Sequence, residues 1–180
     1  IPPEWNVKDA YIKYNKKKIV NFKKNNLHLL GYSYPIKKKV SLDILKKHLY
    51  TFKSNKKVIP YVTSYYKKNW GFCISKEFEN HLKPGEYDVN IDSSFKKNGK
   101  LIIGEVKIKG KSKKEILLST NICHPSMANH ETTGIALATF ISKFLLNRNN
   151  NFTYRILFIP ETVGMISYLK KNLKTLKKNF

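Results

Sequence analysis

The last third of the chain alternates two apolar strands with two helices, and this order restricts the fold more than any other feature. The segments EILLSTNI (115–122) and YRILFIP (154–160) are almost continuously apolar, and helical patterns follow them at 128–146 and 163–178. Such strands are typical of parallel sheets whose faces are both covered by helices. We therefore predict an α/β fold here, with helices on both faces of the sheet.

From about residue 10 to 112 the sequence predicts a different organisation, with short strands separated by turns. The predicted strands are DAYIKY (9–14), IVNF (19–22), LHLLGYSYP (27–35), IPYVTSYY (59–66) and WGFCI (70–74). The predicted helices are SLDILKKHLYTF (41–52), which Ser41 can cap, and SKEFENHL (75–82). The segments 87–95 and 101–110 predict a hairpin, because Asn98 and Gly99 form a favourable turn between them.

Polar side chains follow both apolar strands of the last third. His124 comes just after the first strand, and Glu161 follows the second directly after a proline. In parallel sheets ligands bind beyond the carboxyl ends of the strands, so the two clusters are expected at one rim if the strands are neighbours. Neutral imidazole is a common zinc ligand, and a carboxylate in a cleft can act as a general base. The alternatives are a hydrogen-bonded turn histidine and a helix-capping glutamate.

Three more residues between these elements have metal-ligand side chains. His130 and Glu131 lie at the start of the helix at 128–146, where a glutamate is favourable against the helix dipole whatever its function. Cys123 precedes His124, but neighbouring residues on an extended chain point to opposite faces, which argues against a thiol–imidazole pair. We expect Cys123 and Glu131 to be bystanders.

The net charge of +23 raises the question of a polyanion partner. Lysine and arginine total 35 residues against 12 acidic residues, yet only Arg148 and Arg155 are arginines. Proteins that bind phosphates and bases favour arginine forks, and here the lysines are spread along the whole chain. We expect solvated surface lysines and no specific nucleic-acid partner, with polyanion binding as the alternative.

The cysteines and the hydropathy pattern indicate in which cell compartment the protein is expected. Cys73 and Cys123 are fifty positions apart, which favours neither a disulfide framework nor a zinc knuckle. No segment approaches the roughly 20 apolar residues of a membrane span. The first residues, IPPEWNVKDAY, do not resemble a signal peptide. A cytoplasmic protein is expected.

Two blocks carry a family resemblance. LLSTNICHPSMANHETTGIALATFISKFL (117–145) and YRILFIPETVGMISYL (154–169) resemble the aminopeptidase-like proteins of bacterial surface-polysaccharide gene clusters, in the zinc-dependent exopeptidase superfamily. PPEWNVKDAYI (2–12) through IPYVTSYYKKNWGFCIS (59–75) looks like the β-rich domain inserted in those proteins. Family members are longer, which implies that this chain is a fragment. The resemblance implies three segments: 1–10, the end of a first peptidase-like segment; 11–112, the inserted domain; and 113–180, a truncated peptidase-like α/β segment.

The resemblance implies a site that this chain matches only in part. His124 takes the place of the first metal-binding histidine, and Ser126 stands where the superfamily has an aspartate that orients it. His130 takes the place of the aspartate that bridges two metals, although imidazole is a poor bridging group. Glu161 matches the general base, while Thr162 replaces the metal-binding glutamate after it. A mononuclear zinc site, or none, fits better than a dinuclear one.

The resemblance also implies an activity and partners. It predicts a metal-dependent hydrolase of amide or peptide bonds, linked to surface polysaccharide biosynthesis, with a small peptide or an aminoacyl or amide compound as substrate. The losses at Ser126, His130 and Thr162 favour an alternative, in which the peptidase-like fold persists as a non-catalytic scaffold or binding module. The sequence leaves a homo-oligomer open.

Overall fold

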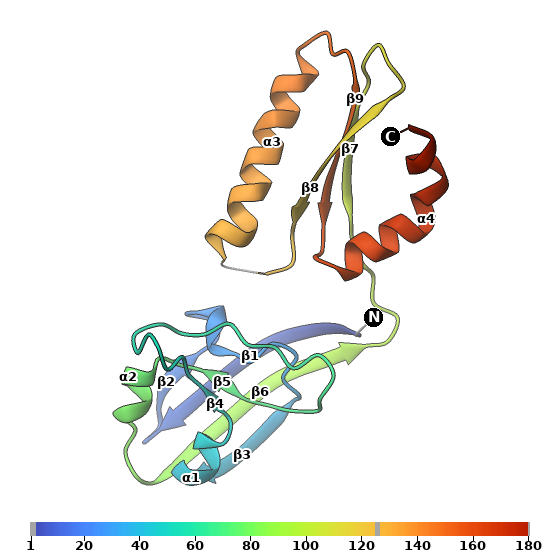
Figure 1. The fold of residues 1–180 in the computed structure, drawn as a ribbon. Coiled ribbons are helices and arrows are strands. Elements are labelled where there is room, and N and C mark those ends of the chain that lie inside the picture. The colour runs from blue at the N-terminus through green and yellow to red at the C-terminus, as the bar shows by residue number, and fades with distance from the viewer. Residues whose placement is uncertain (1–2, 125–126, 180) are drawn as a thin grey trace. The chain divides into compact units, whose positions relative to one another are not determined.

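The computed structural model describes residues 3–124 and 127–179, and it divides the chain into two compact units between Gly99 and Lys100 (Figure 1). Unit 1 contains an antiparallel four-stranded sheet in the order β2-β1-β6-β3. Its strands are β1 (Glu4–Tyr14), β2 (Lys17–Asn21), β3 (Ile36–Ser41) and β6 (Glu86–Lys96). A 3-10 turn (Asn26–His28), helices α1 (Leu42–Lys46) and α2 (Lys76–Asn80), and a short parallel pair, β4 (Leu49–Tyr50) and β5 (Phe72–Cys73), complete the unit.

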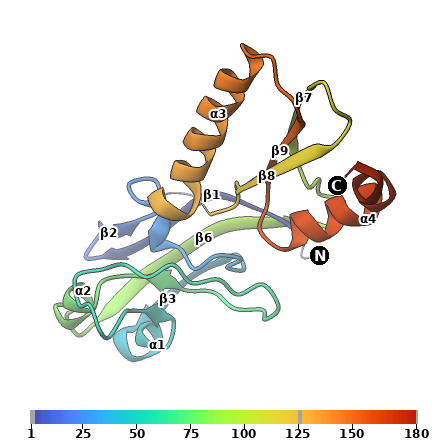
Figure 2. The same cartoon turned by 45° about the horizontal axis from the view of Figure 1, so that its top comes forward.

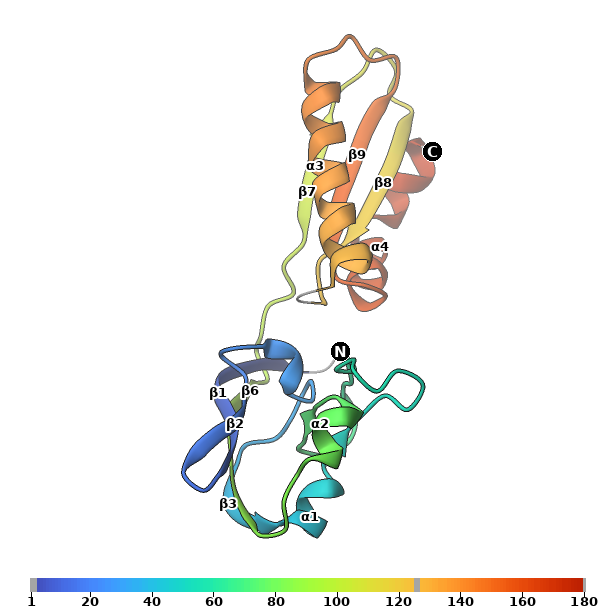
Figure 3. The ribbon, with the colours of Figure 1, turned by 90° about the vertical axis from the view of Figure 1, so that its left-hand side faces the viewer.

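The core of unit 1 lies on one face of this sheet. Tyr87, Val89 and Ile91 are buried at alternate positions of β6, as the two-residue period of a strand requires. They belong to one apolar cluster with Leu45 and Phe72, which come from the α1 and β5 side. Figure 3 shows α1 and α2 on the same side of the sheet.

Two local predictions for unit 1 are confirmed: the strands at 9–14 and 19–22 with a turn between them, and the cap at Ser41. Strands β1 and β2 form an antiparallel hairpin, and Asn15 and Lys16 between them have φ of 48° and 65°. Two successive positive φ values are typical of a type I′ turn, which matches the twist of the strands. The side chains of Ser41 and Ser75 cap α1 and α2 by accepting the N–H groups of Ile44 and Phe78.

Three other predictions for unit 1 are wrong. The predicted helix at 41–52 ends at Lys46, because the backbone beyond it pairs with β5 instead. The predicted strand at 27–35 is a 3-10 turn followed by loop, and 59–66 is a loop with a single bridge from Thr63 to Gly31. Strand β3 was not predicted, because its three lysines conceal a strand pattern that the pairing with β6 supplies.

The predicted hairpin at 87–110 is also wrong. Both edges of β6 are occupied, by β1 and by β3, so the next strand, β7 (Gly104–Ile108), pairs with a strand of unit 2. Gly99 serves a close approach, since a Cβ there would lie 2.2 Å from the Cβ of Glu4. The turn signal therefore marks the point where the chain leaves unit 1.

Unit 2 is a three-stranded sheet in the order β7-β9-β8, with a helix on each face (Figure 1 and Figure 2). Strands β8 (Glu115–Asn121) and β9 (Thr153–Ile159) are parallel, while β7 is antiparallel to β9. Alternate residues of β9 face the two helices: Ile156 packs in the cluster of α3 (Thr133–Leu146), and Leu157 in that of α4 (Val163–Asn179). The predicted parallel strands, with helices on both faces, are confirmed.

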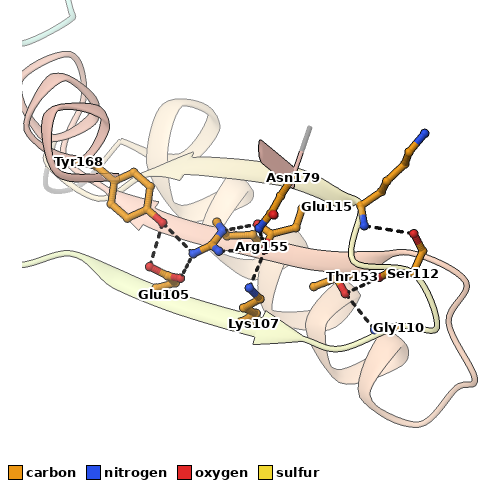
Figure 4. A network of polar contacts seen from close by, with 10 residues as sticks. Glu105, Lys107, Gly110, Ser112, Glu115, Thr153, Arg155, Tyr168 and Asn179 are labelled. Carbon is orange, nitrogen blue, oxygen red and sulfur yellow. Dashed lines mark hydrogen bonds and ion pairs between the residues drawn. The ribbon is translucent and has the colours of Figure 1, made fainter. Parts of the chain in front are cut away.

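A buried ionic network joins the sheet of unit 2 to α4 (Figure 4). The Arg155 guanidinium donates from Nε to Glu115 at 2.6 Å and also binds the carboxylate of Glu105. Tyr168 of α4 donates to Glu105 at 2.9 Å, and Asn179 donates to Glu115 at 2.9 Å. This network holds α4, at Tyr168 in its first half and at its last residue Asn179, against the face of β9 that carries Arg155.

The compact units divide the chain at Gly99, whereas the sequence predicted segment boundaries after residues 10 and 112. The assignment of these segments to a peptidase domain and an insertion stays a prediction. Cys73 and Cys123 are free thiols. Within the described ranges, no helix is both long and apolar enough to cross a membrane.

Candidate metal centre

The carboxyl ends of β8 and β9 lie side by side, and the candidate site begins where they end. The parallel register pairs Asn121 with Ile159, the last residue of each strand. Cys123 and His124 follow the first strand, and Glu161 follows the second. The backbone N–H of Glu161 lies 3.1 Å from the Cys123 sulfur, which connects the two strand ends. The prediction that both polar clusters lie at one rim is therefore confirmed.

A wide π-helical turn at Ala128–Thr132 precedes α3 and brings two more polar side chains to this rim. Gly134 makes this approach feasible, because a Cβ there would lie 2.2 Å from the hydroxyl oxygen of Thr120 on β8. The helix start can thus pack directly on the end of the strand. Single π turns occur often at functional sites, because they alter the direction of the side chains they carry.

Glu131 is the buried centre of the cluster, with 4% of its surface exposed. Its Oε1 lies 3.0 Å from Nδ1 of His124, and its Oε2 accepts the backbone N–H of Cys123 at 2.9 Å. Burial alone would raise the pKa of this carboxyl group, but the hydrogen bonds from His124 and from the Cys123 backbone lower it below its usual value. Glu131 is therefore an ionised acceptor, and His124 donates to it from Nδ1.

His130 and Glu161 complete the cluster on its more exposed side. Nε2 of His130 lies 3.5 Å from Oε2 of Glu161 and 3.5 Å from Oε1 of Glu131. Nδ1 of His124 is 3.9 Å from the same Glu161 oxygen, and the two imidazole centroids are 4.8 Å apart. The Glu161 side chain is 46% exposed, so water can reach it.

Cys123 contacts His124, contrary to the prediction that neighbouring side chains point apart. Strand β8 ends at Asn121 and the chain bends at His124, so Sγ lies 3.4 Å from Nδ1 of that histidine. Burial raises the pKa of the Cys123 thiol, and the carboxylates of Glu131 and Glu161 raise it further against the effect of the Glu161 N–H. A thiol held neutral in this way is a poor nucleophile.

The backbone beside Glu161 is strained. Thr162 has a φ of 54°, in the left-handed region that a β-branched residue rarely adopts. This conformation turns the chain from the end of β9 into α4, whose first residue is Val163. Strained residues of this kind cluster at functional sites, where the surrounding structure holds them.

The structure brings the three predicted site residues, His124, His130 and Glu161, into one cluster, and their roles stay predictions. It adds Glu131, which the sequence predicted to be a bystander. The sequence contained a signal for this role: Glu131 lies at a helix start, seven residues after His124, where its side chain can turn back towards the end of the strand. Ser126, at the position of the expected orienting aspartate, lies outside the described residues.

The donor set suits a single zinc ion. Cys123, His124 and Glu161 each offer a ligand atom within 4.8 Å of the others, and so do His124, His130 and Glu131. Donors of one tetrahedral zinc lie about 3–4 Å apart, because each is about 2.0–2.3 Å from the ion. The 3.5 Å between Nε2 of His130 and Oε2 of Glu161 falls in this range. Nitrogen and sulfur donors with one carboxylate are typical of zinc sites.

The chain is similar in sequence to a curated protein. It is 48% identical, over 178 residues, to a Clostridium acetobutylicum protein named for polysaccharide biosynthesis with an aminopeptidase-like domain. The match covers 98% of this chain and 41% of that relative. The chain thus spans about two-fifths of the relative's length.

Comparison with solved structures gives the fold. A crystal structure from Clostridium acetobutylicum, named as a peptidase, matches with a TM-score of 0.95 at 47% identity, over 99% of this chain and 42% of that one. The zinc aminopeptidase BSAP from Bacillus subtilis matches with a TM-score of 0.60 at 13% identity, over 99% of this chain and 54% of that one. A peptidase M28 precursor from Shewanella amazonensis matches with a TM-score of 0.56 at 12% identity, over 99% of this chain and 58% of that one.

These structures show that the predicted fold class is correct: the chain has a mixed α/β fold like that of the zinc aminopeptidases. The family described as "Domain of unknown function (DUF2172)" matches residues 4–94, which include β1, β2, β3 and most of β6. This match takes in half of the sequence. The chain therefore belongs to the DUF2172 family.

Proposed function

We propose that this chain contributes the first half of the active site of a metal-dependent hydrolase that cleaves amide or peptide bonds. The observation that carries the proposal is the convergence of His124, His130 and Glu161 beyond the parallel ends of β8 and β9. The name of the Clostridium relative extends the proposal to a role in polysaccharide biosynthesis. The peptidase-like structural neighbours support a peptide or aminoacyl substrate. The two free thiols agree with a location in the cytoplasm.

Each residue of the cluster has a proposed role. His124 and His130 would hold the metal, and a bound zinc would lower the pKa of a water ligand and polarise the substrate carbonyl. Glu161 would accept the proton of the attacking water and later deliver it to the leaving amine. Its position beside both imidazoles and its exposure suit that role. Cys123 would hold Glu161 through its contact with the backbone N–H.

Glu131 would act as a positioning residue for His124. By accepting a hydrogen bond from Nδ1–H, it keeps the lone pair of the neutral ring on Nε2, the nitrogen that can bind a metal. Histidine ligands commonly donate their other N–H to a carboxylate in this way. The superfamily resemblance implies a carboxylate two residues after the histidine, and here the carboxylate that contacts the ring comes from seven residues on. The orienting function is thus retained from another position.

Replacing Glu131 with alanine is expected to weaken zinc binding by about 10–100-fold, the usual cost of losing the partner of a histidine ligand. Glu131→Gln should lose less zinc affinity, since the amide oxygen can still accept the hydrogen bond from Nδ1 of His124. A competition titration against a chelating dye measures the affinity, and ¹⁵N shifts of His124 report its tautomer in metal-free protein. Glu79→Ala in α2 is the matched control. An unchanged tautomer in Glu131→Ala would contradict the role.

The activity itself is tested on the full-length protein with an alanyl anilide substrate. Glu161→Gln should lower kcat by about 10²–10⁴-fold, the typical contribution of a general base. Asp43→Asn, a change at an exposed carboxylate of α1, should leave kcat as it is. An equal rate in Glu161→Gln and in the unmodified protein would remove Glu161 from the mechanism.

One observation favours a second candidate, a non-catalytic scaffold. His130 stands where the superfamily resemblance implies a carboxylate that bridges two metals, and an imidazole nitrogen binds only one. A scaffold predicts no anilide hydrolysis by the unmodified full-length protein, with or without added zinc. The same assay therefore separates the two candidates.

A further inference from the structure

An aromatic hollow of about 220 Å³ lies in unit 1, and none of its lining residues belongs to the metal cluster. Its walls include five aromatic rings: Tyr32, Tyr34, Tyr65, Tyr66 and Phe95. Lys67 and Lys68 line it as well, and among its described lining residues there is no carboxylate. The hollow therefore combines apolar ring faces with positive charge.

The rings are held in place by one another. Tyr32 and Tyr65 meet edge to face, with centroids 4.7 Å apart and planes inclined by 61°. Tyr34 and Phe95 are 4.6 Å apart and inclined by 34°. Trp5 stacks on Tyr32 at 5.6 Å, on planes only 18° apart. Ligand binding would cost little ordering here, because the walls of the hollow are preorganised.

The backbone around the hollow is held in an unusual conformation. Tyr32 has a φ of 63°, which a bulky residue rarely adopts. Beside it, a Cβ on Gly31 would lie 2.8 Å from a methyl carbon of Thr63, so only glycine lets the two loops approach. Gly31 donates to Val62 at 2.8 Å and accepts from Ser64 at 2.9 Å. These bonds attach the loop with Tyr65 and Tyr66 to the loop with Tyr32.

Burial does not explain the outermost ring. Tyr66 is 88% exposed and Tyr65 is 40% exposed, so Tyr66 in particular adds little to the core of unit 1. Lys68 places its ammonium 5.8 Å from the centroid of Tyr34. Exposed aromatic rings gathered beside cations, on a strained and glycine-dependent frame, indicate recognition of a ligand rather than stabilisation of the fold.

The chemistry of the walls selects the ligand class. The volume is below the roughly 300–1,000 Å³ of sites for drug-sized ligands, which suits one sugar ring. The C–H groups of a pyranose pack on aromatic faces, tyrosine hydroxyls can bond its hydroxyl groups, and lysine pairs with a carboxylate. A nucleic acid strand would need a longer cationic groove along its phosphates. We propose that this hollow binds an acidic saccharide through a single uronic acid ring.

The test compares two probes on the full-length protein: methyl galacturonide, which is acidic, and methyl galactoside, which is neutral. Saturation-transfer NMR and calorimetry should detect the acidic sugar more tightly than the neutral one, and equally well after EDTA treatment. Tyr66→Ala should weaken galacturonide binding by about 2–10-fold, given the usual energy of an aromatic contact. Lys68→Gln should remove the preference for the acid. These results would be independent of the hydrolase activity.

The control variant is Phe52→Ala, a change at another exposed aromatic residue that does not line the hollow. It should bind galacturonide like the unmodified protein. Absence of saturation transfer from galacturonide, or equal binding by Tyr66→Ala, would overturn the proposal. Salt-sensitive binding of a dodecameric oligo-dT that is lost in Tyr66→Ala would also overturn it, because the hollow would then be a nucleic-acid surface.

Discussion

Replacing His124 with alanine is expected to lower zinc affinity by more than about 100-fold. Loss of a partner behind a histidine ligand costs about 10–100-fold, and loss of the ligand itself should cost more. His124 is also the only residue common to both groups of three donors. The affinity is measured by stripping the protein with EDTA, titrating zinc against a chelating dye and counting bound metal by mass spectrometry.

His81→Ala is the control for this variant, because His81 is an exposed imidazole in unit 1 bonded to the backbone of Glu77. It should bind as much zinc as the unmodified protein. Equal zinc in His124→Ala and in the control would move the metal away from the rim. Negligible zinc in all three proteins would leave the scaffold as the better function.

Replacing Arg155 with methionine should lower the free energy of unfolding of unit 2 by about 3–5 kcal/mol, the usual cost of breaking a buried ion pair from one side. The Glu115 side chain is 1% exposed, so its charge would remain without its main partner and without water. Replacing Glu115 with leucine in the same protein should recover part of the loss. Urea unfolding followed by far-UV circular dichroism measures these changes.

The chain contains its own controls for this experiment. Arg148→Met removes the other arginine, which lies over the exposed ring of Phe144, and should cost less than about 1 kcal/mol. Both tryptophans, Trp5 and Trp70, lie in unit 1, so tryptophan fluorescence should report the unfolding of unit 1. If Arg155→Met and Arg148→Met had the same free energy of unfolding, the network around Arg155 would not stabilise unit 2.

The pH dependence of the same network has a defined sign. Hydrogen bonds from Arg155 hold the pKa of Glu115 at about 2, against an ordinary value of 4.5. A carboxyl group whose pKa is lower in the folded state contributes stability above its unfolded value and loses it as the pH falls. The difference between Glu115→Gln and the unmodified protein should therefore be present at pH 7 and shrink between pH 4.5 and about 2.

Much of unit 2 could be predicted from the sequence because its signals are local. The near-continuous apolar runs at 115–122 and 154–160 became β8 and β9, and the helical patterns after them became α3 and α4. His124 and Glu161 were found for the same reason, since a polar residue after a buried strand marks the rim of a parallel sheet. The family resemblance then supplied their proposed roles.

Unit 1 was predicted less well because its pairings are distant in sequence. Strand β6 is flanked by β1 and by β3, and local patterns did not show that both its edges would be occupied. The turn signal at Asn98 and Gly99 was therefore assigned to a hairpin that does not form. The tyrosine-rich segment 59–66 has a strand's composition, yet it forms a loop, and half of its residues line a hollow or are exposed.

By itself the sequence determined the order of elements in unit 2, its two-sided burial and the position of His124 and Glu161 at strand ends, because periodicity and strand ends are local properties. Only the tertiary structure decided that Glu131 orients towards His124, that Cys123 contacts both strand ends, and that β7 joins β9. Those outcomes depend on which strand edges and polar groups remain unpaired once segments distant in sequence have packed together. A buried polar group without a hydrogen-bond partner costs free energy, so each of these edges and groups pairs with whatever the fold brings near it.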